Sequence, residues 1–493
     1  MKKVLILLLV CLMLLPLAAA CSKQNTAPAQ TSGVTDTEEV TEPDTSEDPY
    51  TPARDLTKLD FDDQEVRLLQ FKYKADEFKP RGGTGDVVEQ ALWDRNTLVE
   101  DDLKIVFKYQ EVDCAEGHIT AFATAIRGAA LADDDATRYH IVAQPSYYVT
   151  GIMQEGLYEN LSGIDNSYID LSKKYWTSAY VDASVVNDRY YFVTGELCSS
   201  ILDKMEVVYV NNALAKAYFE DENILDLVYD KEWTYAKMLE LAAKAGEGES
   251  TGKWGMAIPR DSYSIDGMLC AMGLTMVSLN DSGVPTANIN TQKNIDIVEK
   301  LRDLYWNNKS VNANGNDSNS LPIFSEGNAI FTMTLMDRAS SLYNSGVNYT
   351  LIPMPLYDET QADYIVVAQD NYSIMSLCTG LKNKDRYTAV LEDLCYRSHT
   401  TTYPAVYTKT YSLRYAKLPE NSAMFDYLFE HLNFDLGYIY SFILGDCKNV
   451  PRYLLYPSSY LGINYQSGIG SEFKKLSDAM DEKMTSFIEF FWK

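Results

Sequence analysis

Strand-like and helix-like patterns alternate along this chain of 493 residues, and that alternation limits the fold more than any other feature. Residues 66–71 form a short β-type run, residues 87–103 carry apolar side chains at helical spacing, and residues 104–109 are strand-like again. The same succession returns at residues 207–211 and 213–219. Alternation at this spacing predicts mainly parallel sheets flanked by helices. Two such blocks predict an α/β protein of two lobes, with ligands bound at the carboxyl ends of the strands.

The first 21 residues have the composition of an export signal and not of a folded element. Lys2 and Lys3 precede an unbroken apolar run at residues 4–17, and three alanines at residues 18–20 directly precede Cys21. A positive start, an apolar middle and small residues at the end are the parts of a secretory signal peptide. The run is too short for a comfortable membrane span, which needs about 20 residues. A cysteine in this place resembles the bacterial lipoprotein signal, so residues 1–20 are predicted to be removed and Cys21 to carry the lipid.

Residues 21–57 are predicted to be the lipidated cysteine and a disordered acidic tether behind it. Residues 22–57 contain 8 acidic and 2 basic side chains, are rich in Thr, Pro and Ser, and have almost no large aliphatic residues. Such a segment cannot bury a core. A tether behind a lipid holds the folded body clear of the bilayer. The chain is therefore predicted to be anchored at the extracellular face of the cell membrane of a Gram-positive bacterium.

The charge of the chain excludes several classes of function. Acidic residues number 70 against 43 basic ones, a net charge of −27, and a surface of that sign repels nucleic acids. The chain has four scattered histidines and none of the motifs GxSxG, HExxH or the P-loop. We therefore expect no metal, no cofactor and no catalysis. One alternative stays open, because a glycosidase needs only two carboxylates, at no fixed spacing in the sequence.

Cysteine and tyrosine are the other signals in the composition. Six cysteines follow the leader, none in CxxC spacing and each in or beside apolar sequence: Cys114, Cys198, Cys270, Cys378, Cys395 and Cys447. An extracellular compartment permits disulfides, but a body of this size does not need them, and mostly buried free thiols are predicted. Tyrosines number 36 against 6 tryptophans, a surplus suited to amphipathic ring surfaces.

An ordered set of short motifs resembles one family. The strand-then-helix pattern at residues 207–214, with Glu232, Trp233 and Thr234 before a Leu- and Ala-rich helix, resembles the extracellular solute-binding proteins of ABC transporters. The resemblance is to the carbohydrate-binding lipoproteins related to maltose-binding protein, in their clostridial form. Further stretches agree with the family at residues 324–331, 349–359, 403–407 and 435–440.

The resemblance implies a two-lobe periplasmic-binding-protein-like fold of type II, in which hinge strands join two α/β lobes around a ligand cleft. It places residues 58–197 and 366–425 in the first lobe, and residues 198–365 and 426–493 in the second. Closure around the ligand is then a hinge motion between the lobes.

The ligand-binding residues implied by the resemblance follow predicted strand ends and crossings. Aromatic rings would cover the C–H faces of a sugar, and amide and carboxylate side chains would bind its hydroxyls. The predicted contacts are Gln144, Tyr147, Tyr148, Tyr209, Asn211, Met336, Asp337, Asp370, Asn371 and Tyr372. Met336 and Asp337 stand where many sugar-binding members carry tryptophan, so a stacking platform of the maltodextrin type is not expected.

The leading hypothesis is a monomeric substrate-binding lipoprotein of an ABC transporter. It would capture a neutral solute, a sugar or oligosaccharide, and deliver it to the permease subunits in the membrane. Two alternatives stay open: a secreted polysaccharide-degrading lipoprotein, and a ligand-sensing surface lipoprotein that partners a receptor kinase.

Overall fold

The computed structural model of the protein describes residues 48–493, apart from residues 83–84, 114–118, 132–136, 261, 416–418, 457–462 and 464. The signal peptide, Cys21 and most of the tether lie outside the described residues, and so does Cys114. The described part begins at Asp48 and forms a single unit.

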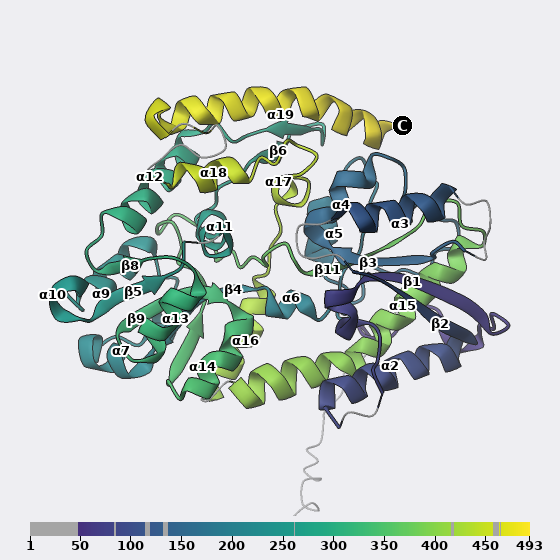
Figure 1. The fold of residues 1–493 in the computed structure, drawn as a ribbon, viewed down its shortest axis with the longest axis horizontal. Helices are drawn as coiled ribbons and strands as arrows, with labels where there is room; N and C mark the ends of the chain where they lie inside the picture. The colour runs from purple at the N-terminus through teal and green to yellow at the C-terminus, as the bar shows by residue number, and fades with distance from the viewer. Residues whose placement is uncertain are drawn as a thin grey trace, which may run out of the picture. The chain divides into compact units, whose positions relative to one another are not determined.

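The first sheet has four strands in the order β11-β3-β1-β2 (Figure 1). These strands are β1 (Gln64–Phe71), β2 (Ile105–Val112), β3 (Ile141–Pro145) and β11 (Ser373–Leu377). The helices that accompany them are α2 (Val87–Leu103), α3 (Ile119–Leu131), α4 (Ser146–Met153), α5 (Ser178–Ser184) and α15 (Lys384–Thr400). We call this part lobe 1.

Helix α2 shows how the sequence builds lobe 1. The Asp86 side chain caps the helix by accepting hydrogen bonds from the backbone N–H groups of Val88 and Glu89. The helical spacing of apolar residues puts Val99 and Leu103 on one face, and both are fully buried. That face packs beside β2 and α15. The helix predicted from the apolar spacing is therefore confirmed.

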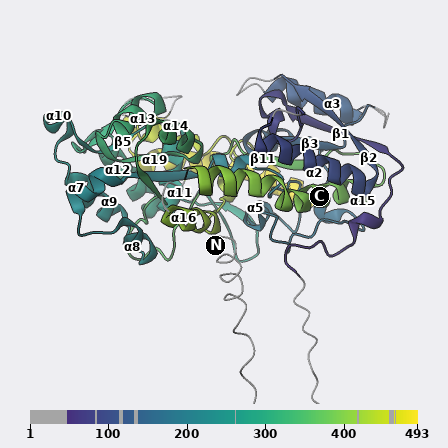
Figure 2. The same cartoon turned by 90° about the horizontal axis from the view of Figure 1, so that it is seen from below.

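The second sheet has five strands in the order β10-β4-β9-β5-β8. These strands are β4 (Glu206–Asn211), β5 (Trp254–Ile258), β8 (Val311–Ala313), β9 (Ala329–Leu335) and β10 (Tyr349–Ile352), beside a separate hairpin of β6 (Val277–Leu279) and β7 (Pro285–Ala287). The helices of this part are α7 (Asn212–Phe219), α8 (Ile224–Tyr229), α9 (Tyr235–Ala243), α10 (Gly248–Thr251), α11 (Ser262–Ala271), α12 (Gln292–Trp306), α13 (Asp317–Ser325), α14 (Ala339–Ser345), α16 (Pro419–Glu430) and α18 (Asn449–Leu454). We call this part lobe 2, and Figure 2 shows its strand β5 with α12 and α13, apart from β1, β2 and α15 of lobe 1.

The strand directions confirm the predicted parallel pattern in part. In lobe 1, β1 pairs in parallel with β2 and β3, and in lobe 2, β5 pairs in parallel with β8 and β9. The prediction is wrong for β11 and β4, which run antiparallel to their neighbours β3 and β9. Both strands follow a passage of the chain from one lobe to the other. They therefore start at the sheet edge where the neighbouring strand ends, with Ser373 opposite Pro145 and Glu206 opposite Leu335.

Three segments of the chain lie side by side where it passes between the lobes. The backbone N–H of Glu206 donates to the carbonyl of Val367 at 2.9 Å, and that of Gln369 donates to Lys204 at 2.8 Å. Val366 in turn forms a parallel bridge with Leu432. Residues 204–206, 366–372 and 431–435 thus form a backbone ladder, which we call the crossing ladder. The other elements outside the two sheets are α6 (Ser200–Asp203), a π-helix (Pro404–Tyr415), α17 (Leu436–Ile439) and α19 (Ile469–Trp492), with 3₁₀ turns at Leu56–Lys58, Lys72–Glu77, Leu161–Gly163, Met336–Arg338 and Tyr465–Ser467.

Two helices lie differently from the lobe boundaries predicted above. Residues 419–425 were placed in the first lobe, but α16 packs on β10 of lobe 2, where the Asn421 side chain donates to the carbonyl of Tyr349 at 3.0 Å. Helix α19 was placed in the second lobe alone. It packs on β7 and α12 of lobe 2, and its last turn also reaches lobe 1, where Asn187 donates to the carbonyl of Phe491 at 2.9 Å. In both helices, buried apolar side chains decide the packing partner.

The last ten residues of the predicted tether, 48–57, pack on the folded body. The ring of Tyr50 stacks on His399 with ring centroids 4.2 Å apart, and the Arg54 guanidinium lies 3.4 Å from the ring centroid of Tyr168. The side chain of Leu56 is buried. Ring stacking by Tyr50, the cation–π contact of Arg54 and the burial of Leu56 hold this stretch against the body. Its overall composition is nevertheless that of a tether.

The prediction of buried free thiols is confirmed for the described cysteines. All are buried and none forms a disulfide: Cys198, Cys270, Cys378, Cys395 and Cys447. Within the described ranges, no helix combines the length and the apolar character that a membrane span requires. In the same part of the chain, no three His, Cys, Asp or Glu side chains come together as a metal site.

Two adjacent buried carboxylates on α15 make the stability of lobe 1 sensitive to pH. Burial raises the pKa of Glu392 to about 7, against hydrogen bonds from Tyr175, the backbone of Asp170 and Trp176. Burial also raises the pKa of Asp393 to about 7, although the Arg397 Nε lies 3.5 Å from its carboxylate. Both values lie above the usual carboxyl pKa of about 4.

We expect these two groups to destabilise the fold as the pH rises. Because the folded state holds their protons more tightly than the unfolded chain, their contribution is fully present below about pH 4 and is lost as the pH rises toward about 7. Asp393→Asn should flatten this part of the pH profile of the unfolding free energy, measured by denaturant titration between about pH 4 and pH 8. Glu299→Gln, at an exposed position, is the matched control. An unchanged slope in Asp393→Asn would contradict the assignment.

Candidate functional site

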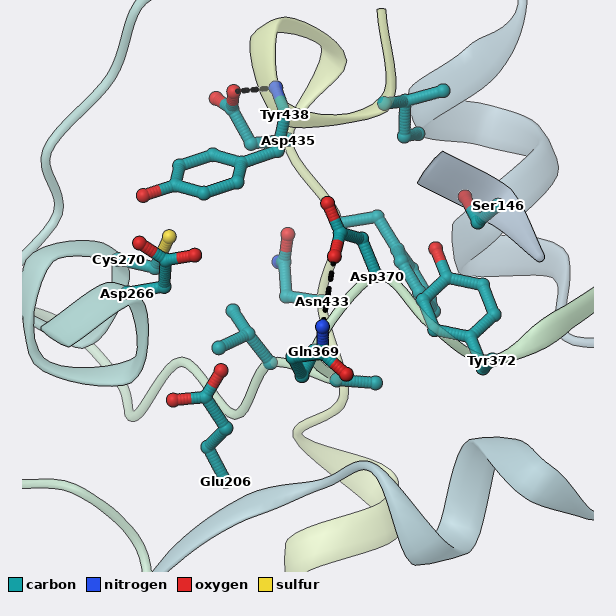
Figure 3. A pocket seen from close by; sticks show the side chains of 14 residues that line it. Ser146, Glu206, Asp266, Cys270, Gln369, Asp370, Tyr372, Asn433, Asp435 and Tyr438 are labelled. Atoms are coloured by element: carbon teal, nitrogen blue, oxygen red, sulfur yellow. Dashed lines mark hydrogen bonds between the residues drawn. The ribbon is translucent and has the colours of Figure 1, made fainter. Parts of the chain in front are cut away.

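A cavity lies where the crossing ladder meets both lobes (Figure 3). Its lining residues come from α4, β4, α11, the crossing ladder and α17: Ser146, Glu206, Asp266, Cys270, Val367, Ala368, Gln369, Asp370, Tyr372, Asn433, Phe434, Asp435, Tyr438 and Ile439. The volume open to water is about 40 Å³, enough for a few water molecules. The cavity is therefore a narrow space at the junction of the lobes, with a mainly apolar surface into which a few polar groups point.

Lobe 2 and the crossing ladder deliver four carboxylates to this cavity. Glu206 opens β4 and is 1% exposed, and Asp266 lies within the largely apolar helix α11. Asp370 belongs to the crossing ladder, and Asp435 caps α17 by accepting from the backbone N–H of Tyr438 at 3.0 Å. A close approach fixes the Glu206 carboxylate: a Cβ atom at Gly267 would lie 2.2 Å from Glu206 Oε2.

Two cations from the C-terminal part of the chain meet two of these carboxylates. Arg452 of α18 binds Asp266 through both arms of its guanidinium, with Nε 2.6 Å from Oδ1. Burial works against this charge, but the carboxylate of Asp266 raises the pKa of Arg452. The Lys448 Nζ contacts the carboxylate of Asp370. Burial raises the pKa of a third carboxylate, Asp435, to about 6, opposed by the backbone N–H groups at the start of α17.

Aromatic rings complete the site. Tyr372 packs edge-on against Tyr180 and Phe434, with ring centroids 6.1 Å and 5.7 Å away. The Tyr147 ring lies under the Lys448 ammonium, 4.0 Å from its Nζ to the ring centroid. In Figure 3 the Tyr438 hydroxyl points toward Asp266 and Cys270. The arrangement can hold a ligand that offers hydrogen-bond donors to carboxylates and apolar faces to rings.

The structure brings several of the predicted contacts to this region. Asp370 and Tyr372 line the cavity, and Asn371 lies between them and accepts a hydrogen bond from the Tyr73 hydroxyl at 3.2 Å. The backbone N–H of Tyr147 donates to the carbonyl of Asp370 at 2.9 Å, which places α4 against the crossing ladder. The side chain of Tyr148 lies outside the described part of the chain.

Three other predicted contacts lie away from the cavity, where they are buried or form hydrogen bonds inside lobe 2. The Tyr209 hydroxyl donates to the carbonyls of Leu335 and Met336, and the ring is fully buried in lobe 2. Asn211 caps α7 by accepting from two backbone N–H groups. The predicted contact Met336 is likewise buried, at 2% exposed.

Two more predicted contacts are engaged in polar interactions within one lobe. Gln144 is buried in lobe 1, where it accepts from the Tyr158 hydroxyl at 2.9 Å. Asp337, directly after β9, pairs with Lys204 at 3.1 Å and with Arg338 at 2.7 Å. Asp337 does not line the cavity, but its pairing with Lys204 keeps it beside the crossing ladder.

Sequence analysis missed Glu206, Asp266, Asp435, Lys448 and Arg452 as site residues. A signal existed for two of them, because Glu206 heads an apolar strand and Asp266 interrupts an apolar helix, and an isolated charge in such a place needs a partner or a function. No spacing in the sequence links residues 448 and 452 to the cavity. Only the fold of the C-terminal segment brings them there.

Solved structures of known proteins share this architecture. The maltose/maltodextrin-binding domain of Bdellovibrio bacteriovorus, bound to maltotriose, is 14% identical and matches 85% of this chain and 100% of its own, with a TM-score of 0.53. The maltose-binding protein of Listeria monocytogenes, in complex with maltose, is 12% identical, with 86% and 98% covered and a TM-score of 0.55. An ABC substrate-binding protein of L. monocytogenes, in complex with cycloalternan, is 13% identical, with 86% and 100% covered and a TM-score of 0.53.

These likenesses confirm the predicted two-lobe α/β fold. No curated protein matches the sequence. The sequence profile of one family, the bacterial extracellular solute-binding proteins, matches residues 118–391, more than half of the chain. The chain belongs to this family of bacterial extracellular solute-binding proteins.

Proposed function

We propose that this chain captures a carbohydrate at the cavity between its lobes and delivers it to an ABC permease. One observation carries the proposal: carboxylates from lobe 2 and the crossing ladder converge with aromatic rings on a single space, which α4 of lobe 1 closes with Ser146. Sugar hydroxyls donate to carboxylates, and sugar C–H faces pack on rings. The proposed contacts are Glu206, Asp266, Asp370, Asn371, Tyr372, Asp435 and Tyr438, with Tyr147, Tyr148 and Asp337 at the margin.

The ligands of the similar structures support a carbohydrate. Maltotriose, maltose and cycloalternan are each bound by a protein with this fold. At these sequence identities, a shared fold does not identify the ligand of this chain. The evidence for a carbohydrate is therefore the lining of the cavity. Two lobes joined by a crossing ladder also give the hinge that capture and release require.

The proposed role is binding without catalysis. A glycosidase needs one carboxylic acid free to give a proton and a second carboxylate free to attack or to activate water. Here Asp266 is held by Arg452, Asp370 is held by Lys448, and Asp435 is engaged as the cap of α17, so three of the four cavity carboxylates already serve structural contacts. Ion pairs of this kind suit recognition, because they fix carboxylate positions while discouraging protonation.

The proposed setting is the extracellular face of the cell membrane of a Gram-positive bacterium, with the protein acting as a monomer. The leader and Cys21 support a lipid anchor, and an acidic segment separates that anchor from the folded body. Several acyl chains on one cysteine would hold the protein at a bilayer more firmly than a single chain.

Removing the Glu206 carboxylate should weaken carbohydrate binding. Titration calorimetry against a sugar library that includes maltotriose should find a ligand, and Glu206→Gln should lose about 10- to 100-fold in affinity, the equivalent of one hydrogen bond to a charged group. Tyr209→Phe is the control: it should cost about 1–3 kcal/mol of stability by leaving two carbonyl acceptors unpaired, with affinity unchanged. Binding of peptides but of no carbohydrate would contradict the proposal, and release of shortened glycans would favour the polysaccharide-degrading alternative.

Removing the proposed lipid site should release the protein from the membrane. In cells that express the full chain, we expect wild-type protein in the membrane fraction and Cys21→Ser in the medium. Cys11→Ser, inside the apolar run of the leader, is the matched control and should stay with the membrane. Equal membrane retention of Cys21→Ser and wild type would contradict the lipid anchor.

A further inference from the structure

A cation seat lies at the edge of the cavity, and the protein fills it with its own ammonium group. The seat consists of the Asp370 carboxylate from the crossing ladder and the ring face of Tyr147 from lobe 1. Lys448 occupies it, with Nζ in contact with the carboxylate and 4.0 Å from the ring centroid. Lys448 precedes α18, which packs on α11 and α12 of lobe 2. A carboxylate and an aromatic face are the two elements that bind ammonium groups in proteins.

The Lys448 side chain is buried, at 2% exposed, whereas the Asp370 side chain that pairs with it is 19% exposed. Burial and the nearby positive charge of Arg452 lower the pKa of Lys448 well below its usual value. Holding a charged lysine in the seat therefore carries a desolvation cost. A bound amine that takes the place of Lys448 lets the lysine return to water, which offsets the desolvation of that amine.

The surroundings of the seat carry more negative than positive charge. The cavity beside it is lined by four carboxylates, and the two cations that meet them are Lys448 and Arg452. If Lys448 leaves, the Asp370 carboxylate, whose side chain is 19% exposed, loses its cation. A neutral ligand replaces that cation only with hydroxyl donors, whereas an amine restores the ion pair. The net charge of −27 over the whole chain also attracts cationic solutes.

The size of the cavity requires that something moves when a ligand enters. A volume of about 40 Å³ holds a few water molecules and not a sugar ring. Lys448 is well placed to move, because it comes from a different segment than the carboxylate and the ring that hold it. Its departure enlarges the space next to Asp370 and Tyr372, which line the cavity.

We infer that Lys448 holds the place of a ligand amine, and that the captured carbohydrate is an amino sugar or another glycan that carries a protonated amine. This inference rests on the proposed capture of carbohydrate and changes one feature of it, the charge of the solute. Lys448 then acts as an internal competitor that sets the affinity and keeps Asp370 paired between ligands.

The test compares one trisaccharide that carries protonated amines with two trisaccharides that carry no charge. Titration calorimetry of the full-length protein uses the trimer of glucosamine, the trimer of N-acetylglucosamine, and maltotriose. We expect the glucosamine trimer to bind at least about tenfold more tightly than the other two, the scale of one charge-assisted contact. Its affinity should fall as salt is raised. Equal or tighter binding of N-acetylglucosamine trimer or maltotriose would overturn the inference while leaving the capture of carbohydrate intact.

Variants of Lys448 separate competition from a structural role. Lys448→Met empties the seat, so affinity for the glucosamine trimer should rise at least about tenfold, and the ligand should restore thermal stability that the substitution removes. Lys448→Arg keeps a cation in the seat and should show no gain. Lys474→Met changes an exposed lysine that pairs with Asp478 and is the control for charge alone. A Lys448→Met protein that binds the amine no better than wild type would overturn the inference. If that variant does not fold, the comparison of the two trimers on wild-type protein decides.

Discussion

The crossing ladder is the interaction on which the rest of the structure depends. Its backbone hydrogen bonds from Glu206 to Val367 and from Gln369 to Lys204 tie the first strand of lobe 2 to the segment that leads into β11 of lobe 1. The ladder therefore joins the two sheets where β4 and β11 begin. It also explains why carboxylates meet there, since Glu206 and Asp370 belong to the ladder itself. Because backbone groups carry the contact, side chains at these positions are left to face a ligand.

Local patterns predicted most of the secondary structure, because apolar spacing records which face of each element is buried. The bounds of α2 agree with the sequence prediction, those of the strand at 207–211 differ by one residue, and the alternation of strands and helices indicated the correct fold class. The directions of β4 and β11 were beyond local patterns. They depend on the crossing ladder, which is made of contacts between residues far apart in the chain.

The candidate site was harder to predict than the fold, for a physical reason. A strand buried on both faces shows no alternation, so the sequence around Tyr209 does not indicate which side chains reach the sheet edge. Tyr209 and Asn211 looked suitable for a ligand, yet their polar atoms complete bonds inside lobe 2. The same holds for Tyr440, whose hydroxyl donates to the carbonyl of Ser184 at 2.6 Å. Part of the tyrosine surplus thus serves to satisfy buried backbone acceptors, with Tyr147 and Tyr372 left at the cavity.

The pairing of β11 with β3 has a consequence for how the chain reaches its native state. Ser373 lies opposite Pro145, so the sheet of lobe 1 lacks one edge strand until all five strands of the lobe 2 sheet have been synthesised. Helix α15, which packs on α2, arrives later still. Such distant pairings slow folding, because a long loop must close before the contact forms. Lobe 1, on which the N-terminal segment rests, therefore becomes complete only when the chain has been synthesised through α15, at Thr400 of 493 residues.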